Sequence, residues 1–95
     1  MTASIIGPDY RKRVLVVGAG EAGALVVREL HKHPETGMLP VAFLDDDPRK
    51  RGQRVAGVPV VGTVDTAAEV IVSNGIDQVL IAMPSKGGRA IRKVI

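Results

Sequence analysis

The sequence predicts an α/β fold, a parallel β-sheet with helices on both faces. Short runs of branched apolar residues alternate with segments of helical periodicity, as is typical of parallel strands joined by crossover helices. The residues 18–23, Gly-Ala-Gly-Glu-Ala-Gly, directly follow the first apolar run and predict a tight turn from strand to helix. Such folds bind ligands at the edge of the sheet where the carboxyl ends of the strands meet.

The first half of the chain predicts a strand, a helix and a second strand. Residues 14–17 form a continuous apolar run, which indicates a strand buried on both faces. The apolar residues that follow recur at helical spacing, and Pro34 with Gly37 ends this helix. Residues 41–44 form the second strand.

The second half is predicted to continue the alternation. Residues 55–61 form a short extended segment, and Pro59 indicates an edge position or little pairing. A helix capped by Thr63 or Asp65 then leads to a buried strand. The helix is expected to cover residues 67–71 and to end near Asn74 and Gly75. The strand is expected over residues 78–83, followed by the start of an amphipathic helix at residues 90–95.

The length of the chain limits how much of a nucleotide-binding fold it holds. A doubly wound dinucleotide fold needs two mononucleotide halves, and 95 residues supply one half and part of the next. We therefore expect a truncated half-fold over residues 13–95, preceded by a tail or linker at residues 1–12. The open edge of such a sheet is compatible with a homodimer.

Composition excludes several classes of function. The net charge of +3 comes from local clusters, and with 2% aromatic residues there is no stacking platform, so we expect no nucleic-acid partner. The absence of cysteine excludes disulfides and thiolate chemistry. No apolar run approaches the ~20 residues of a membrane-spanning helix.

The glycine-rich turn matches the G-x-G-x-x-G pattern of a dinucleotide-binding, Rossmann-like unit. In that pattern Gly18 allows the tight turn, Gly20 lets the backbone approach a diphosphate, and Gly23 lets the helix lie against the sheet. We expect the backbone amides of five residues to hold the phosphates, namely Gly18, Ala19, Gly20, Glu21 and Ala22. A turn with a purely structural role is the alternative. A phosphate-binding P-loop is excluded because Ala24 and Leu25 stand where Lys and Ser or Thr are required.

Other candidate site residues follow the later strands. Asp45 ends the second strand, where a carboxylate accepts hydrogen bonds from ribose and favours NAD over NADP, and Asp46 lies beside it. The basic residues 49–51 are expected to form a solvated loop, although one of them could pair with the 2′-phosphate of NADP or the 3′-phosphate of CoA. The last candidates line the crevice after the strand at residues 78–83, and they are Met83, Pro84 and Ser85.

Three segments of the chain resemble the CoA-binding-like, nucleotide-binding domain of bacterial CapD-like polysaccharide-biosynthesis proteins, which are nucleoside-diphosphate-sugar epimerases and dehydratases. They are RVLVVGAGEAGALVVREL, VAFLDDDPRKRGQRVAGVPVVGT and QVLIAMPS. The pattern is also similar to a nucleotide-sugar-binding domain of sugar acetyltransferases and to the NAD-sensing half of a redox-responsive repressor.

The resemblance implies a non-catalytic module that binds NAD(H) beside the membrane helices and catalytic domain of a parent protein, on the cytoplasmic face of the bacterial inner membrane. The family's catalytic Tyr-x-x-x-Lys pair is absent, because Val14 stands four residues after the one tyrosine, Tyr10. The alternative is a regulatory or assembly module that binds a nucleotide sugar or CoA.

Overall fold

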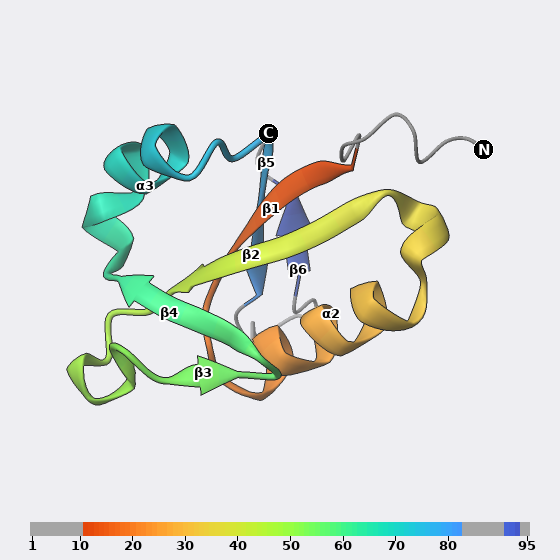
Figure 1. Cartoon of the computed structure of the whole chain (residues 1–95). Helices are drawn as coiled ribbons and strands as arrows, with labels where there is room; N and C mark the ends of the chain where they lie inside the picture. Colours follow the sequence, from red (N-terminus) through yellow and green to blue (C-terminus); the bar gives the residue numbers. More distant parts are fainter. Residues whose placement is uncertain (1–10, 83–90, 94–95) are drawn as a thin grey trace.

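A computed structural model describes residues 11–82 and the backbone of residues 91–93. These residues form a six-stranded sheet of order β3-β4-β2-β1-β5-β6 (Figure 1). Strand β1 (Lys12–Val17) lies between β2 (Met38–Leu44) and β5 (Gln78–Ala82), and it is parallel to both. The glycine-rich turn, which follows β1, therefore lies at the centre of the sheet's edge.

The outer strands make the sheet mixed. Strand β4 (Val58–Gly62) is parallel to β2, whereas the short strand β3 (Arg54–Val55) is antiparallel to β4. At the other edge, β6 (Ile91–Lys93) is antiparallel to β5. The predicted α/β fold is confirmed, and its four central strands are parallel.

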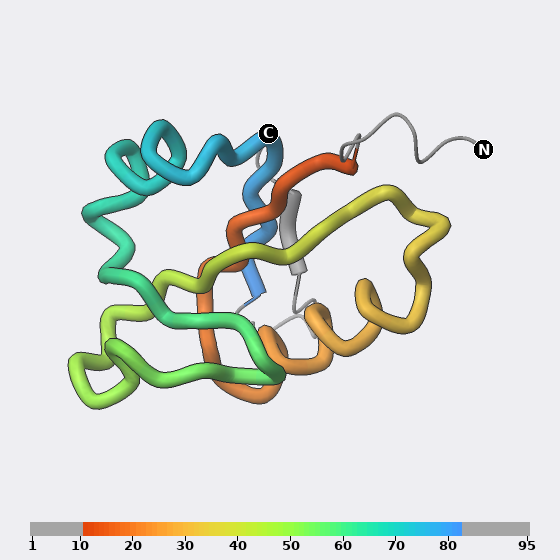
Figure 2. The backbone as a smooth tube through the Cα atoms, in the orientation of Figure 1, coloured from red at the N-terminus to blue at the C-terminus, as the bar shows by residue number. Residues whose placement is uncertain are grey.

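Two α-helices cover opposite faces of the sheet, as predicted, and Figure 2 shows them on either side of the strands. Helix α2 (Glu21–Lys32) packs on the face that carries Val14 and Val16 of β1. Helix α3 (Ala67–Ser73) packs on the face that carries Leu15 and Val17. Adjacent residues of β1 thus enter different cores, which explains its unbroken apolar run.

Three single-turn 3₁₀ helices complete the described chain. Helix η1 (Pro34–Thr36) follows α2, η2 (Pro48–Lys50) follows β2, and η3 (Val64–Thr66) leads into α3. No helix in residues 11–82 has both the length and the apolar character needed to cross a membrane.

Two predicted elements need correction. The helix expected over residues 90–95 is wrong for residues 91–93, which form β6, because pairing with the otherwise open edge of β5 outweighs helical periodicity. The segment that contains Pro59 is not an edge strand, since β4 lies between β3 and β2. Its pairing with β2 involves Val60 and Gly62, so the missing N–H of Pro59 falls before that ladder begins.

Candidate nucleotide-binding site

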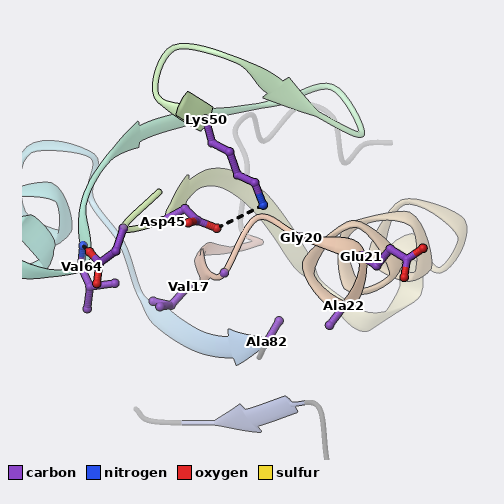
Figure 3. Close-up of a pocket in the computed structure, with 10 residues that line it drawn as sticks. Val17, Gly20, Glu21, Ala22, Asp45, Lys50, Val64 and Ala82 are labelled. Atoms are coloured by element: carbon purple, nitrogen blue, oxygen red, sulfur yellow. Dashed lines mark hydrogen bonds and ion pairs between the residues drawn. The ribbon is translucent and has the colours of Figure 1, made fainter. Parts of the chain in front are cut away.

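A cavity of about 470 Å³ opens at the carboxyl ends of the central strands. Its lining includes six of the predicted site residues, namely Gly18, Gly20, Glu21, Ala22, Asp45 and Asp46. Four further residues that were not in the predicted site complete the lining, and they are Val17, Lys50, Val64 and Ala82. The first strand, the first helix and the acidic end of the second strand thus meet around one space (Figure 3).

The three glycines of the turn meet different steric demands. Gly18 has φ +105°, a conformation that L-residues with side chains rarely adopt, and its N–H donates to the Leu44 carbonyl over 2.8 Å. A Cβ on Gly23 would lie 1.9 Å from the Gly18 carbonyl oxygen and 2.9 Å from the Phe43 ring. Gly23 is therefore required for the packing of α2 against the sheet.

Gly20, in contrast, faces open space. Its nearest neighbour, the Lys50 Nζ atom, would lie 3.8 Å from an added Cβ, which is an ordinary contact distance. The fold alone does not require glycine here. The absence of a side chain at residue 20 leaves room in the cavity at the start of α2.

The N-terminus of α2 opens toward this room. Gly20 occupies the N-cap position, and no side-chain hydrogen bond caps the helix within the described chain. The first N–H groups of an α-helix have no acceptor within the helix and carry the positive end of its dipole. The start of α2 therefore offers donors to an anionic group in the cavity.

The Asp45 carboxylate joins the end of β2 to the glycine-rich turn. Its Oδ2 atom accepts the Ala19 N–H over 2.7 Å, and its Oδ1 atom accepts the Asp47 N–H over 2.8 Å. Burial raises the pKa of Asp45, but these two hydrogen bonds and the nearby charge of Lys50 outweigh burial and lower the pKa below its ordinary 3.8. Asp45 is therefore ionised at neutral pH.

Asp46 has a different position. Its side chain is exposed, and its Oδ1 atom accepts the Val64 N–H over 2.9 Å at the start of η3. This bond joins the end of β2 to the segment after β4, so that Val64 forms a wall of the cavity. Asp46 thus holds this wall in place.

The expectation that residues 49–51 form a solvated loop is wrong for Lys50. Its side chain is only 32% exposed and points toward the glycine-rich turn, with Nζ 3.8 Å from Asp45 Oδ2. The Arg49 side chain is 87% exposed and pairs with Asp47. This pairing lowers the pKa of Asp47 and raises that of Arg49, because each side chain stabilises the charged form of the other.

The remaining predicted residues are distributed as follows. The side chain of Ala19 is buried outside the cavity lining, and its N–H donates to Asp45. The Glu21 carboxylate points away from Asp45 and Lys50, as Figure 3 shows, so it does not oppose an anion at the turn. Met83, Pro84 and Ser85 lie outside the described residues.

Sequence reasoning missed the four residues Val17, Lys50, Val64 and Ala82 for identifiable reasons. Val17 and Ala82 are the last described residues of β1 and β5, so the rule that strand ends form the site could have found them. In the sequence, Lys50 is only one of three basic residues that could pair with a phosphate, and its direction toward Ala19, like the bond of Val64 to Asp46, is a contact between segments distant in sequence. No short sequence pattern encodes either of these two contacts.

The sequence of this chain is similar to those of known protein families. A family model described as a CoA-binding domain matches residues 7–95. The chain belongs to this CoA-binding domain family. One relative is the probable polysaccharide biosynthesis protein EpsC of Bacillus subtilis, which is 38% identical over 77% of this chain. Another is the capsular polysaccharide biosynthesis protein CapD of Staphylococcus aureus, which is 31% identical over 88% of this chain. The chain spans only 12% and 14% of the lengths of these two proteins.

Solved structures share the fold of this family member. UDP-D-quinovosamine 4-dehydrogenase from Vibrio fischeri is similar with a TM-score of 0.69 and 33% identity, covering 79% of this chain and 59% of that one. The Rex-family repressor RSP, in a complex with β-NAD⁺ and operator DNA, is similar with a TM-score of 0.67 and 25% identity, covering 87% of this chain and 37% of the repressor. The predicted resemblance to polysaccharide-biosynthesis proteins is confirmed.

Proposed function

We propose that this chain is the nucleotide-binding module of a bacterial polysaccharide-biosynthesis protein of the nucleoside-diphosphate-sugar epimerase or dehydratase type. Its ligand is NAD(H), and the module binds the nucleotide without performing the sugar chemistry itself. The observation that carries the proposal is the convergence of the uncapped start of α2 and the ionised Asp45 on one cavity.

The residues of the cavity fit the adenosine diphosphate half of a dinucleotide. A carboxylate has about four acceptor sites, and Asp45 uses one on each oxygen for an N–H donor, so acceptor sites remain for ribose hydroxyls. The amides at the start of α2 would bind the diphosphate, for which the absence of a side chain at Gly20 leaves room. A volume of about 470 Å³ is within the range of small-molecule sites.

Two observations favour NAD(H) over related ligands. Asp45 is ionised and would repel a 2′-phosphate, which disfavours NADP. The repressor RSP, which shares this fold at 25% identity, was solved with β-NAD⁺. NADP, CoA and nucleotide sugars are the alternatives that the experiment below separates.

The setting of the module follows from its relatives. The chain corresponds to 12–14% of the length of EpsC and CapD, so we assign the catalytic step to another part of a larger parent protein. We place the module on the cytoplasmic face of the inner membrane, next to membrane helices of that parent. The residues 1–12 then act as the linker to the preceding part, and residues 13–95 as the binding domain.

Thermal unfolding of the 95-residue chain in the presence of NAD⁺, NADP⁺, CoA or a UDP-sugar tests the proposal. A ligand at 100 times its Kd adds about 2.7 kcal/mol to the free energy of unfolding. We expect NAD⁺ to stabilise most. The Asp45→Ala variant should lose at least about tenfold in affinity for NAD⁺, because a charged acceptor of ribose hydrogen bonds is removed.

The matched control is Glu69→Ala, which removes an exposed carboxylate from α3, on the other face of the sheet. Its ligand-induced shift should equal that of the wild-type chain. A preference for NADP⁺ would contradict the role of Asp45. Stabilisation by CoA or a UDP-sugar alone would favour the regulatory or assembly module, and no shift with any ligand would contradict nucleotide binding altogether.

A further inference from the structure

The ammonium group of Lys50 lies directly over the glycine-rich turn. Its Nζ atom is 3.5 Å from the Ala19 carbonyl oxygen and 3.8 Å from Asp45 Oδ2, and it would be 3.8 Å from a Cβ on Gly20. It also contributes to the lining of the cavity, unlike its neighbours Arg49 and Arg51. Figure 3 shows the side chain reaching across the space toward the start of α2.

The local fold determines which basic side chain of this loop reaches the cavity. Asp47 caps η2 by accepting the Arg49 N–H over 3.0 Å, and its carboxylate also binds the Arg49 guanidinium through two contacts of 3.0 Å. Arg49 is thereby held in solvent. The next residue, Lys50, then projects from the other side of the single turn, toward Ala19.

The contacts that Lys50 makes with residues 11–82 leave its hydrogen-bonding capacity unfilled. An ammonium group has three donors, whereas the contact with Ala19 is at the long limit of a hydrogen bond and the contact with Asp45 is longer still. Asp45 already accepts two N–H groups at shorter distances. Donors of Lys50 therefore remain available on the side where the start of α2 presents its own N–H groups.

We infer that Lys50 contacts the bound nucleotide and donates to its diphosphate from the side opposite the α2 amides. This inference rests on the proposed function and specifies how the charge of the ligand is recognised. A diphosphate carries charge that the helix dipole compensates only in part, and a lysine ammonium adds a full positive charge at short range. The site would then select ligands by their diphosphate.

A phosphate on the ribose is the competing contact for Lys50, and the surroundings disfavour it. On the side expected for the ribose, Lys50 faces the Asp45 carboxylate at 3.8 Å, and Asp46 adds a second acidic residue to the cavity lining, so a further anion there would be repelled. On the side of Gly20 no carboxylate of the described residues intervenes, because Glu21 points away. The diphosphate at the start of α2 is thus the better partner.

NMR titration of the ¹⁵N-labelled chain tests this inference, since it measures affinities into the millimolar range. The ligands are NAD⁺, NADP⁺, ADP and adenosine, and the variants are Lys50→Gln, Lys50→Arg and the control Arg51→Gln, which removes an exposed charge from the same loop. We expect Lys50→Gln to weaken NAD⁺ and ADP by about 10- to 100-fold and adenosine by less than about threefold. Lys50→Arg should retain part of the affinity, and Arg51→Gln nearly all of it.

Three results would overturn the inference while leaving nucleotide binding intact. They are unchanged ADP affinity in Lys50→Gln, an equal loss for ADP and adenosine, and a loss confined to NADP⁺, which would assign Lys50 to a ribose phosphate. If the wild-type chain binds none of the four ligands, the proposed function itself fails and this inference fails with it. Thermal unfolding without ligand establishes that each variant is folded.

Discussion

At the scale of single residues, the Asp45 carboxylate has a structural task as well as a candidate binding task. Each of its oxygens accepts a backbone N–H, one from Ala19 in the turn and one from Asp47 in the next loop. An asparagine could accept only one of these two bonds, because its amide nitrogen is a donor. Substitution of Asp45 should therefore lower both ligand affinity and the free energy of unfolding.

The lowered pKa of Asp45 predicts how this structural task depends on pH. The folded state binds the proton of Asp45 more weakly than the unfolded state does, so the ionised carboxylate stabilises the fold at pH values above the ordinary pKa of 3.8. This stabilisation is lost as the pH falls through the lower pKa of the folded state. The difference in free energy of unfolding between wild type and Asp45→Asn should be constant near neutral pH and shrink below about pH 4. Urea unfolding of both proteins between acidic and neutral pH measures this difference. A difference that grows in acid would contradict the assigned hydrogen bonds.

The candidate site shows which residues a sequence can reveal. The glycines and Asp45 were predictable because backbone geometry at a strand-to-helix turn demands particular residue types at fixed spacing. Lys50 was not, because nothing in the run Arg-Lys-Arg at residues 49–51 distinguishes one cation from its neighbours. In the folded loop Arg49 pairs with Asp47, whereas Lys50 reaches Ala19, and this difference depends on tertiary contacts.

At the scale of elements, the junction of β1 and α2 contains two glycines with opposite expected responses to substitution. Gly23→Ala should unfold the chain or weaken it severely, because the new Cβ would overlap the Gly18 carbonyl and press on Phe43. Gly20→Ala should lower the free energy of unfolding by no more than about 1 kcal/mol, since only an N-cap preference is lost. It should nevertheless abolish nucleotide binding, because the methyl group would occupy the room expected for the diphosphate.

Circular dichroism on denaturation and the same ligand titration measure the two effects. The pair forms its own control, since the same small side chain is added three residues apart in one helix start. Normal nucleotide affinity in Gly20→Ala would contradict the assignment of this space to phosphate. Normal stability in Gly23→Ala would contradict the close contact of α2 with the turn at Gly18 and with Phe43 of β2.

Element boundaries were harder to predict than element types. Strand β2 begins at Met38, ahead of the predicted residue 41, although Pro40 usually interrupts a strand. The register with β1 shifts between Val14 and Leu15, opposite Pro40 and Ala42, so the residue without an N–H lies at an irregularity of the ladder. Pairing with β1 on either side of this irregularity extends the strand past Pro40.

At the scale of the whole molecule, the order of the strands was only partly encoded in local sequence. The parallel direction of β1 and β2 and of β4 and β5 agrees with their connections through α2 and α3, as is typical of crossover helices. The antiparallel edge strands β3 and β6 are two and three residues long, too short for a periodicity to identify. Their positions result from free hydrogen-bonding groups at the edges of β4 and β5.

This arrangement predicts a gradient of local stability across the sheet. Strand β1 pairs with β2 on one side and β5 on the other, and a buried apolar cluster covers each of its faces. Strand β3, in contrast, is an edge strand that pairs only with β4 among the described strands. Amide hydrogen exchange should therefore be slowest in β1 and fast in β3, because opening β1 requires disruption of both cores. Exchange of β1 as fast as that of β3 would contradict the central position of β1.

The hydrogen bond from Ala19 to Asp45 also has a kinetic consequence. Because the second strand already fixes the loop before any coenzyme arrives, association needs no slow rearrangement of the backbone around the anion. The encounter should then be a single-step docking whose rate rises linearly with coenzyme concentration, and differences among variants should appear in the residence time.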